Sequence, residues 1–173
     1  MISSTIISGA AFSRKRRVLT SVFWVGEKSN RSGFDPLVES IYKQLEKELP
    51  GVEVYLTSRD KAETTYLVKT MSDKTRGSYY IYKVAEKTIE KIADVSPWLT
   101  EAFMADMKPI TYKSRDGLTI HGYLTLPKGQ IAKDLPVVVN PHGGPWARDV
   151  WGFNPEVQFL ANRGYAVLQV NFR

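Results

Sequence analysis

The sequence contains no cysteine and only two histidines, His121 and His142. The absence of cysteine excludes disulfides, a thiol nucleophile and cysteine-ligated metal sites. A metal site built on His142 would need carboxylates that the sequence does not group with it. We therefore expect neither a metal nor a cofactor, and any catalysis would rest on the chain's own oxygen and nitrogen groups.

Long apolar runs are also missing. No stretch approaches the roughly 18 apolar residues that a membrane helix needs. The first residues place apolar side chains before the basic cluster Arg14–Arg17, the reverse of the order in a secretory signal. We expect no membrane partner and favour a cytoplasmic location. The compartment stays open, because a chain without cysteine suits a reducing cytosol and also a periplasm.

A recognised nucleic-acid motif is absent as well. Lysine and arginine outnumber the acidic residues by 24 to 18, a net charge of +6, but the one dense basic cluster is Arg14–Arg17. No aromatic stacking platform accompanies it. The cluster is typical of a solvated turn between two strands, and we expect no nucleic-acid partner.

What is present in the first half is one helix among strands. Residues 17–25 are β-branched and aromatic and predict a strand, and the polar residues after it predict a loop. Residues 36–49 carry an apolar residue at every fourth position, with Asp35 as N-cap and Pro36 at the first helical position. Short strands at even spacing then predict a meander such as a propeller blade: 52–58, 64–72 and 78–94, the last broken near Glu86 and Lys87.

The second half changes character after an irregular stretch at 95–109. A hairpin forms around Asp116 and Gly117. The continuous apolar run 135–140 predicts a strand buried on both faces. A helix at 153–164 and a second buried strand at 165–172 complete a βαβ unit with parallel strands.

The turn His142-Gly143-Gly144 follows the strand at 135–140 directly. The carboxyl end of a parallel strand is where open α/β sheets bind ligands. Glycines let the backbone approach a ligand and present its N–H groups, which an oxyanion hole requires. Two alternatives stand beside this: a plain connecting loop, and a metal site at His142 with distant His121.

Three blocks of the second half resemble the prolyl oligopeptidase family of serine peptidases, in its acylaminoacyl-peptidase and dipeptidyl-aminopeptidase branch. They are "SRDGLTIHGYLTLP" (114–127), "LPVVVNPHGGPWARD" (135–149) and "LANRGYAVLQVNFR" (160–173). Upstream, residues 33–51 and 78–99 are similar to the last part of that family's β-propeller.

The resemblance implies an α/β fold: the N-terminal part of an α/β-hydrolase domain, preceded by the last β-meander, or blade, of a β-propeller. Residues 1–98 would be the propeller end with its helix, and 99–173 the truncated catalytic domain. The Gly144 backbone N–H would donate to the oxyanion, Gly143 would shape the turn, and His142 would line the site without being the triad base.

The sequence departs from the family in lacking a nucleophile elbow: no Gly-x-Ser-x-Gly occurs, and no histidine follows His142. We therefore interpret the chain as a fragment of a serine peptidase that hydrolyses short peptides through an acyl-enzyme, inactive by itself. Its partners would be a short peptide substrate and the rest of the same polypeptide, and an oligomer is compatible with the sequence.

Two further functions remain open at this point. An esterase on the same hydrolase fold would share the turn, although the helix and strands of the first half resemble a propeller end rather than a lipase cap. A non-catalytic binding or interaction module from a truncated gene would keep the junction and lose the chemistry.

Overall fold

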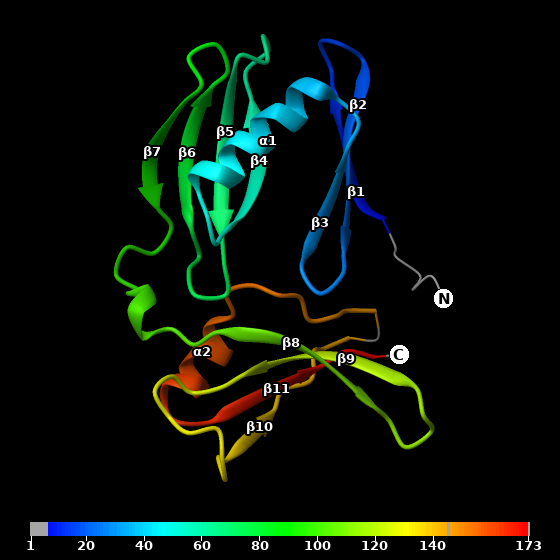
Figure 1. Ribbon diagram of the computed structural model, residues 1–173, viewed down its shortest axis with the longest axis vertical. Helices are drawn as coiled ribbons and strands as arrows, with labels where there is room; N and C mark the ends of the chain where they lie inside the picture. The colour runs from blue at the N-terminus through cyan, green and yellow to red at the C-terminus, as the bar shows by residue number, and fades with distance from the viewer. Residues whose placement is uncertain (1–6, 145, 173) are drawn as a thin grey trace. The chain divides into compact units, whose positions relative to one another are not determined.

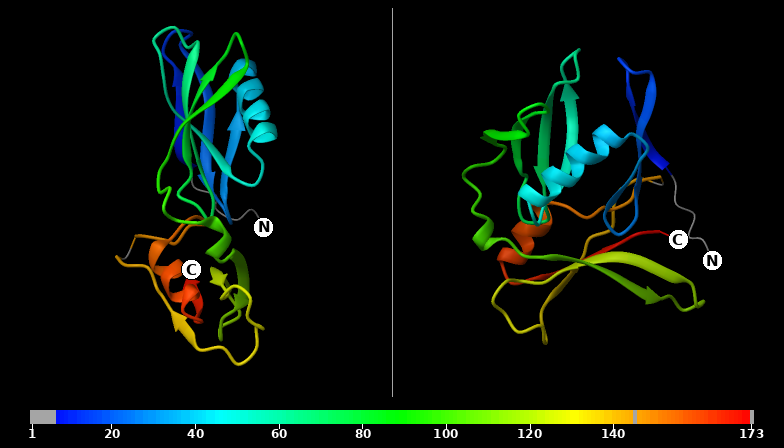
Figure 2. Two further views of the ribbon diagram at one scale, coloured as in Figure 1. Left: turned by 90° about the vertical axis from the view of Figure 1, so that its left-hand side faces the viewer. Right: turned by 45° about the horizontal axis from the view of Figure 1, so that its top comes forward.

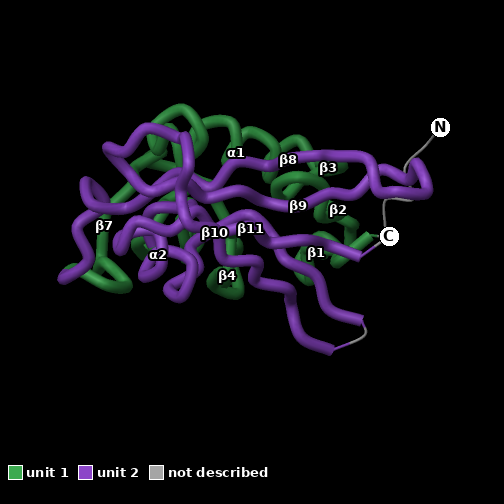
Figure 3. Tube along the Cα trace, turned by 90° about the horizontal axis from the view of Figure 1, so that it is seen from below, with its two compact units in different colours: residues 1–72, 76–97 green, residues 73–75, 98–173 purple. Residues whose placement is uncertain are grey.

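A computed structural model describes residues 7–144 and 146–172. The chain divides into two compact units (Figure 3). Unit 1 comprises residues 1–72 and 76–97, and unit 2 comprises residues 73–75 and 98–173. The expected assignment of residues 1–98 to a propeller and of 99–173 to a hydrolase domain stays a prediction at this stage.

Unit 1 contains two antiparallel sheets and one helix (Figure 1). The first sheet has the order β1-β2-β3 and the second the order β4-β5-β6-β7, a four-stranded meander in which each strand pairs with its sequence neighbour. Propeller blades are built from such meanders. The strands are β1 (Ile7–Ser13), β2 (Val18–Val25), β3 (Ser29–Gly33), β4 (Glu53–Arg59), β5 (Thr65–Met71), β6 (Ser78–Lys83) and β7 (Thr88–Asp94).

Helix α1 (Pro36–Glu48) confirms the helix expected from the fourfold apolar spacing. Asp35 caps it, since its carboxylate accepts a hydrogen bond of 3.0 Å from the Val38 N–H. Helix α1 lies against the meander (Figure 2). Its apolar stripe packs there, since Ile41 and Leu45 form a core with Tyr66, Val68 and Tyr82. Helix and meander thus bury one another's apolar faces.

The basic cluster Arg14–Arg17 forms the turn between β1 and β2, as expected. Arg16 pairs with the carboxylates of Asp35 and Glu63, the latter at 3.3 Å. Glu63 is only 6% exposed and also accepts hydrogen bonds from Ser13 Oγ at 2.7 Å and Arg59 Nε at 3.1 Å. Two buried carboxylates and two arginines therefore fasten the β1–β2 turn to the start of α1.

This network makes unit 1 sensitive to acid. Burial raises the pKa of Glu63 and of Asp35, but hydrogen bonds from Ser13 and Arg16 to Glu63, and from Arg16 and the Val38 N–H to Asp35, outweigh it, so both pKa values are lowered. A carboxyl with a lowered folded-state pKa stabilises the fold above its unfolded pKa of about 4, and that stability is lost as the pH falls through the folded value. We expect the free energy of unfolding, measured in urea, to be level above about pH 5 and to fall steeply below about pH 4.

Asp35→Asn is the matched control for this acid sensitivity. Asparagine caps a helix as well as aspartate does, but it cannot form the charged pair with Arg16. The variant should keep α1. Its free energy of unfolding should fall less steeply between pH 5 and pH 2 than that of the wild type. The same slope in both proteins would contradict the assignment, because other acidic groups with lowered pKa values, such as Asp60 and Asp94, are unchanged between them.

Unit 2 contains a mixed four-stranded sheet with the order β10-β11-β9-β8, a 3₁₀ turn and helix α2 (Pro155–Asn162). β10 and β11 are parallel, which confirms the predicted βαβ unit, and β11 runs antiparallel to β9. Asn154 caps α2, and Gly164, at φ +91°, ends it. The strands are β8 (Met107–Lys113), β9 (Thr119–Thr125), β10 (Val137–Val139) and β11 (Ala166–Val170).

Helix α2 covers one face of this sheet. Val157 packs with Val167, Tyr123 and Met107, and the Trp151 indole N–H donates to the Met107 carbonyl oxygen at 2.9 Å. The buried Gln158 amide is fully used: its oxygen accepts from the Ala105 N–H, and its nitrogen donates to the carbonyls of Ala105 and Asp73. Apolar packing and satisfied amides together hold α2 in place.

Three local expectations were wrong. Residues 29–33, expected to be loop, form β3, and β1 was not predicted. The strand expected at 135–140 is shorter and is not buried on both faces, since Val137 and Val139 are 58% and 59% exposed. β10 is an edge strand that pairs only with β11 among the described strands, so it lies at the border of the sheet and not at its centre.

Candidate functional site

The His142-Gly143-Gly144 turn lies beyond the carboxyl end of β10 and before α2. The Asn140 N–H still pairs with the Leu168 carbonyl at 2.8 Å, so the parallel ladder continues to the residue before Pro141. Gly143 and Gly144 are exposed, and Gly144 adopts φ +70°, a conformation that favours glycine. Among the residues that the structure describes, no backbone hydrogen bond engages the Gly144 N–H. Gly143 and Gly144 thus form an exposed turn beyond the carboxyl end of a parallel strand.

His142 is half-buried at the start of the turn. Its Nδ1 lies 3.2 Å from the Gly143 carbonyl oxygen, so a proton on Nδ1 is donated to the turn itself. The ring meets Phe172 edge to face, with centroids 5.7 Å apart and planes at 70°. The structure thus brings His142 together with Gly143 and Gly144. It places His121, the other histidine, as an exposed residue on β9.

The segment that begins with the turn at His142 is held by hydrogen bonds at Asp149. The Asp149 N–H donates to Asn171 Oδ1 at 2.7 Å, and the Asp149 carbonyl accepts from Asn171 Nδ2 at 3.1 Å. Gln169 Nε2 donates to the Asp149 carboxylate at 2.7 Å. Asn171, Phe172 and Asp149 were not singled out from the sequence. Asn171 and Phe172 lie within residues 165–172, which the sequence predicts only as a buried strand, so local sequence carried no signal for these contacts.

Arg148, beside Asp149, reaches a buried hydroxyl. Burial raises the pKa of Tyr123, and the hydrogen bond and positive charge of Arg148 oppose that rise without cancelling it. Tyr123 is 2% exposed and belongs to the core under α2. Its hydroxyl therefore stays protonated at neutral pH and serves to hold the segment after the turn against the sheet.

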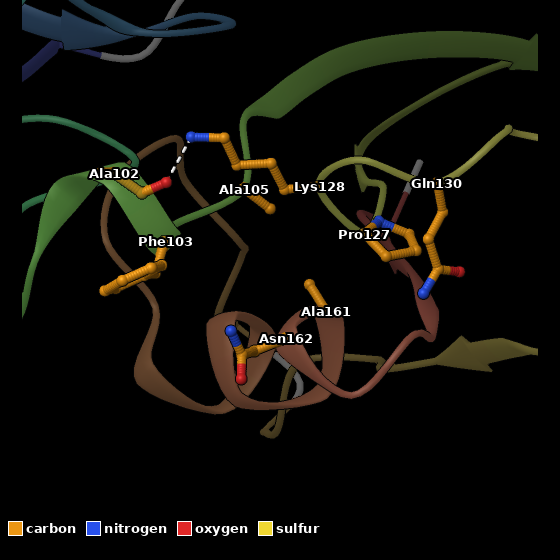
Figure 4. Close-up of a pocket in the computed structure, with 8 residues that line it drawn as sticks. All are labelled: Ala102, Phe103, Ala105, Pro127, Lys128, Gln130, Ala161 and Asn162. Atoms are coloured by element: carbon orange, nitrogen blue, oxygen red, sulfur yellow. Dashed lines mark hydrogen bonds between the residues drawn. The ribbon is translucent and has the colours of Figure 1, made fainter.

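A separate pocket of about 190 Å³ lies elsewhere in unit 2 (Figure 4). Lys128 crosses it to donate a hydrogen bond to the Ala102 carbonyl. Lys128 is the one titratable side chain among the lining residues, which offer neither a nucleophile nor an acid–base pair. The lining residues are Ala102, Phe103, Ala105, Pro127, Lys128, Gln130, Ala161 and Asn162.

Within residues 7–144 and 146–172, no group of three or more histidine or acidic side chains is placed to hold a metal ion. The alternative metal site at His142 thus has no ligand set among these residues. The helices of the described part of the chain are too short or too polar to cross a membrane.

The chain has relatives both by sequence and by fold. No family model matches the chain. Dipeptidyl aminopeptidase BIII of Pseudoxanthomonas mexicana is 36% identical over 146 residues, which cover 80% of this chain and 21% of that protein. Dipeptidyl peptidase family member 6 of Caenorhabditis elegans is 32% identical over 145 residues, which cover 72% of this chain and 20% of that protein.

A solved prolyl endopeptidase structure matches the fold with a TM-score of 0.68 at 15% identity, covering 99% of this chain and 25% of that one. The chain belongs to the prolyl oligopeptidase family. The two curated relatives are peptidases. This chain spans about a fifth of the length of each of them.

Proposed function

We propose that this chain is part of a longer serine peptidase of the prolyl oligopeptidase family, and that it supplies the oxyanion-binding turn of the active site. Unit 1 is the end of the propeller, and unit 2 is the N-terminal part of an α/β-hydrolase domain. The peptidase cleaves short peptides by acyl transfer to a serine, followed by hydrolysis of the ester.

The observation that carries the proposal is the Gly144 N–H. Gly144 is an exposed residue with φ +70°, and it lies beyond a parallel strand of a βαβ unit. A preorganised N–H aimed at a developing negative oxygen stabilises the tetrahedral intermediate of acyl transfer. Gly143 supports the turn, and His142 lines it and donates to the Gly143 carbonyl rather than acting as the triad base.

The sequence contains no Gly-x-Ser-x-Gly elbow, and no histidine follows His142. An oxyanion donor stabilises a charge that a nucleophile must first create. The serine, aspartate and histidine of the triad therefore come from outside these residues, and the 173-residue chain has no peptidase activity by itself.

The test is to express the source reading frame beyond Arg173 and to assay dipeptidyl and N-acyl-aminoacyl anilides beside the matching esters. We expect anilide hydrolysis that a fluorophosphonate abolishes, with the 173-residue chain inert. Hydrolysis of esters alone would replace the peptidase with an esterase. A product that neither turns over substrate nor reacts with the fluorophosphonate would indicate a non-catalytic interaction module.

A further inference from the structure

The two residues that follow β11 contact both ends of the turn segment 142–149. Asn171 binds Asp149 at one end, and the Phe172 ring meets the His142 ring at the other. Two consecutive residues thus span the segment that contains Gly143 and Gly144. We call Asn171 and Phe172 the 171–172 clamp.

The Asn171 side chain fixes the orientation of the Asp149 backbone. Its amide oxygen accepts from the Asp149 N–H and its amide nitrogen donates to the Asp149 carbonyl, so one planar side chain fixes both backbone groups of a single residue. Asn171 is itself 6% exposed, and its own N–H donates to the His121 carbonyl on β9 at 2.9 Å. The clamp is therefore anchored to the sheet and not to another loop.

The turn needs such an external support. Gly143 and Gly144 are exposed, and a Cβ added at Gly143 would meet no atom within 4 Å, so packing does not fix their backbone. Ordering a residue costs about 1 to 2 kcal/mol of conformational entropy, and most for glycine. An oxyanion donor is effective only if it is already in place when the charge develops.

We propose that Asn171 and Phe172 are positioning residues for the Gly144 oxyanion donor, with Asn171 the main support. They touch no substrate and act by holding the ends of segment 142–149 against the sheet. This inference rests on the proposed function of the turn, but its first consequence concerns the backbone alone and can be measured without any activity.

The first experiment measures amide hydrogen exchange in the 173-residue chain for wild type, Asn171→Ala and Asn162→Ala. The exposed Asn162 at the end of α2 provides the matched asparagine control. We expect Asn171→Ala to speed exchange of the Asp149 amide, which donates to Asn171 Oδ1, by about tenfold, the loss of roughly one hydrogen bond, with α2 and β9 unchanged. Unchanged exchange at Asp149, or equal loosening of α2 and β9, would overturn the proposal.

The second experiment uses the longer peptidase and compares Asn171→Ala with Asp149→Asn. Both clamp hydrogen bonds reach backbone atoms of Asp149, and asparagine at 149 also keeps a side-chain oxygen that can accept from Gln169 Nε2. Alanine at 171 removes both clamp hydrogen bonds. We expect Asn171→Ala to lower kcat about tenfold or more with KM within twofold of wild type, and Asp149→Asn to keep most of kcat. A change in KM alone, or a larger loss with Asp149→Asn, would overturn the clamp. An inactive wild type would refute the proposed function and leave the exchange result standing.

Discussion

Replacing the Gly144 N–H with an ester oxygen lowers kcat of the longer peptidase by about 100- to 1000-fold, because one preorganised oxyanion donor typically contributes that much. Glycolic acid at position 144, introduced with a suppressor tRNA, makes this change without adding a side chain. It leaves the Cα and the carbonyl unaltered, so the φ of +70° remains accessible. KM should change little, since the oxyanion exists only after attack on the carbonyl.

The same ester at Gly143 is the control. Gly143 is exposed like Gly144 and lies in the same turn, but its proposed role is to shape the turn and not to donate. We expect its ester to lower kcat less than about tenfold. Equal losses of kcat at 143 and 144 would mean that the ester disturbs the turn as a whole. A Gly144 ester with the kcat of the wild type would show that the Gly144 N–H is not an oxyanion donor.

Gly77→Ala should be the most damaging single substitution in unit 1. Gly77 stands at φ +80° just before β6, and a Cβ there would lie 1.7 Å from the Thr70 carbonyl oxygen on β5. Backbone atoms within a sheet cannot move aside, so the β5–β6 pairing must open. We expect a loss of at least about 3 kcal/mol in the free energy of unfolding, or insoluble protein.

Gly51→Ala is the control that separates the cost of the steric clash from the cost of the left-handed backbone conformation. Gly51 has the same φ of +80°, but a Cβ there would meet nothing within 4 Å. Its substitution should cost only the conformational strain, about 1 to 2 kcal/mol. Urea unfolding followed by circular dichroism compares the two variants. Equal stability of Gly77→Ala and Gly51→Ala would show that the close approach to Thr70 has no energetic effect.

The elements that could be predicted from the sequence are those with complete local signals. Residues 36–49 carry a cap, a proline at the first turn and an apolar stripe, and they form α1 within one residue of that range. The βαβ unit at 135–172 follows from the change of hydrophobic period and from the right-handed crossover rule, and β10 pairs parallel to β11.

The elements that could not be predicted depend on distant partners. The sequence of β3, "SNRSG", is polar and has the composition of a turn, yet it pairs with β2 along five residues. Tertiary pairing here overrides a weak strand propensity. The apolar run at 135–140 predicts burial on both faces, but a strand's burial is set by its neighbours, and β10 has a described partner on one side only.

The candidate site also has one part that could be predicted from the sequence and one that could not. The turn at 142–144 could be located from neighbouring residues, because an apolar run that predicts a strand, followed by glycines, defines its place in the sheet. The hydrogen bonds of Asn171 to Asp149 join residues 22 positions apart, and the contact between His142 and Phe172 joins residues 30 positions apart. Such contacts arise from the crossover that brings β11 beside β10, and local sequence carries no signal for them.

The most direct measurement of the central proposal is to determine the source gene sequence in frame beyond Arg173. We predict a Gly-x-Ser-x-Gly elbow, followed by an aspartate and then a histidine, which would complete the site to which Gly144 donates. A stop codon directly after Arg173, in a gene whose product is made, would contradict it, because the turn would then have no nucleophile to serve.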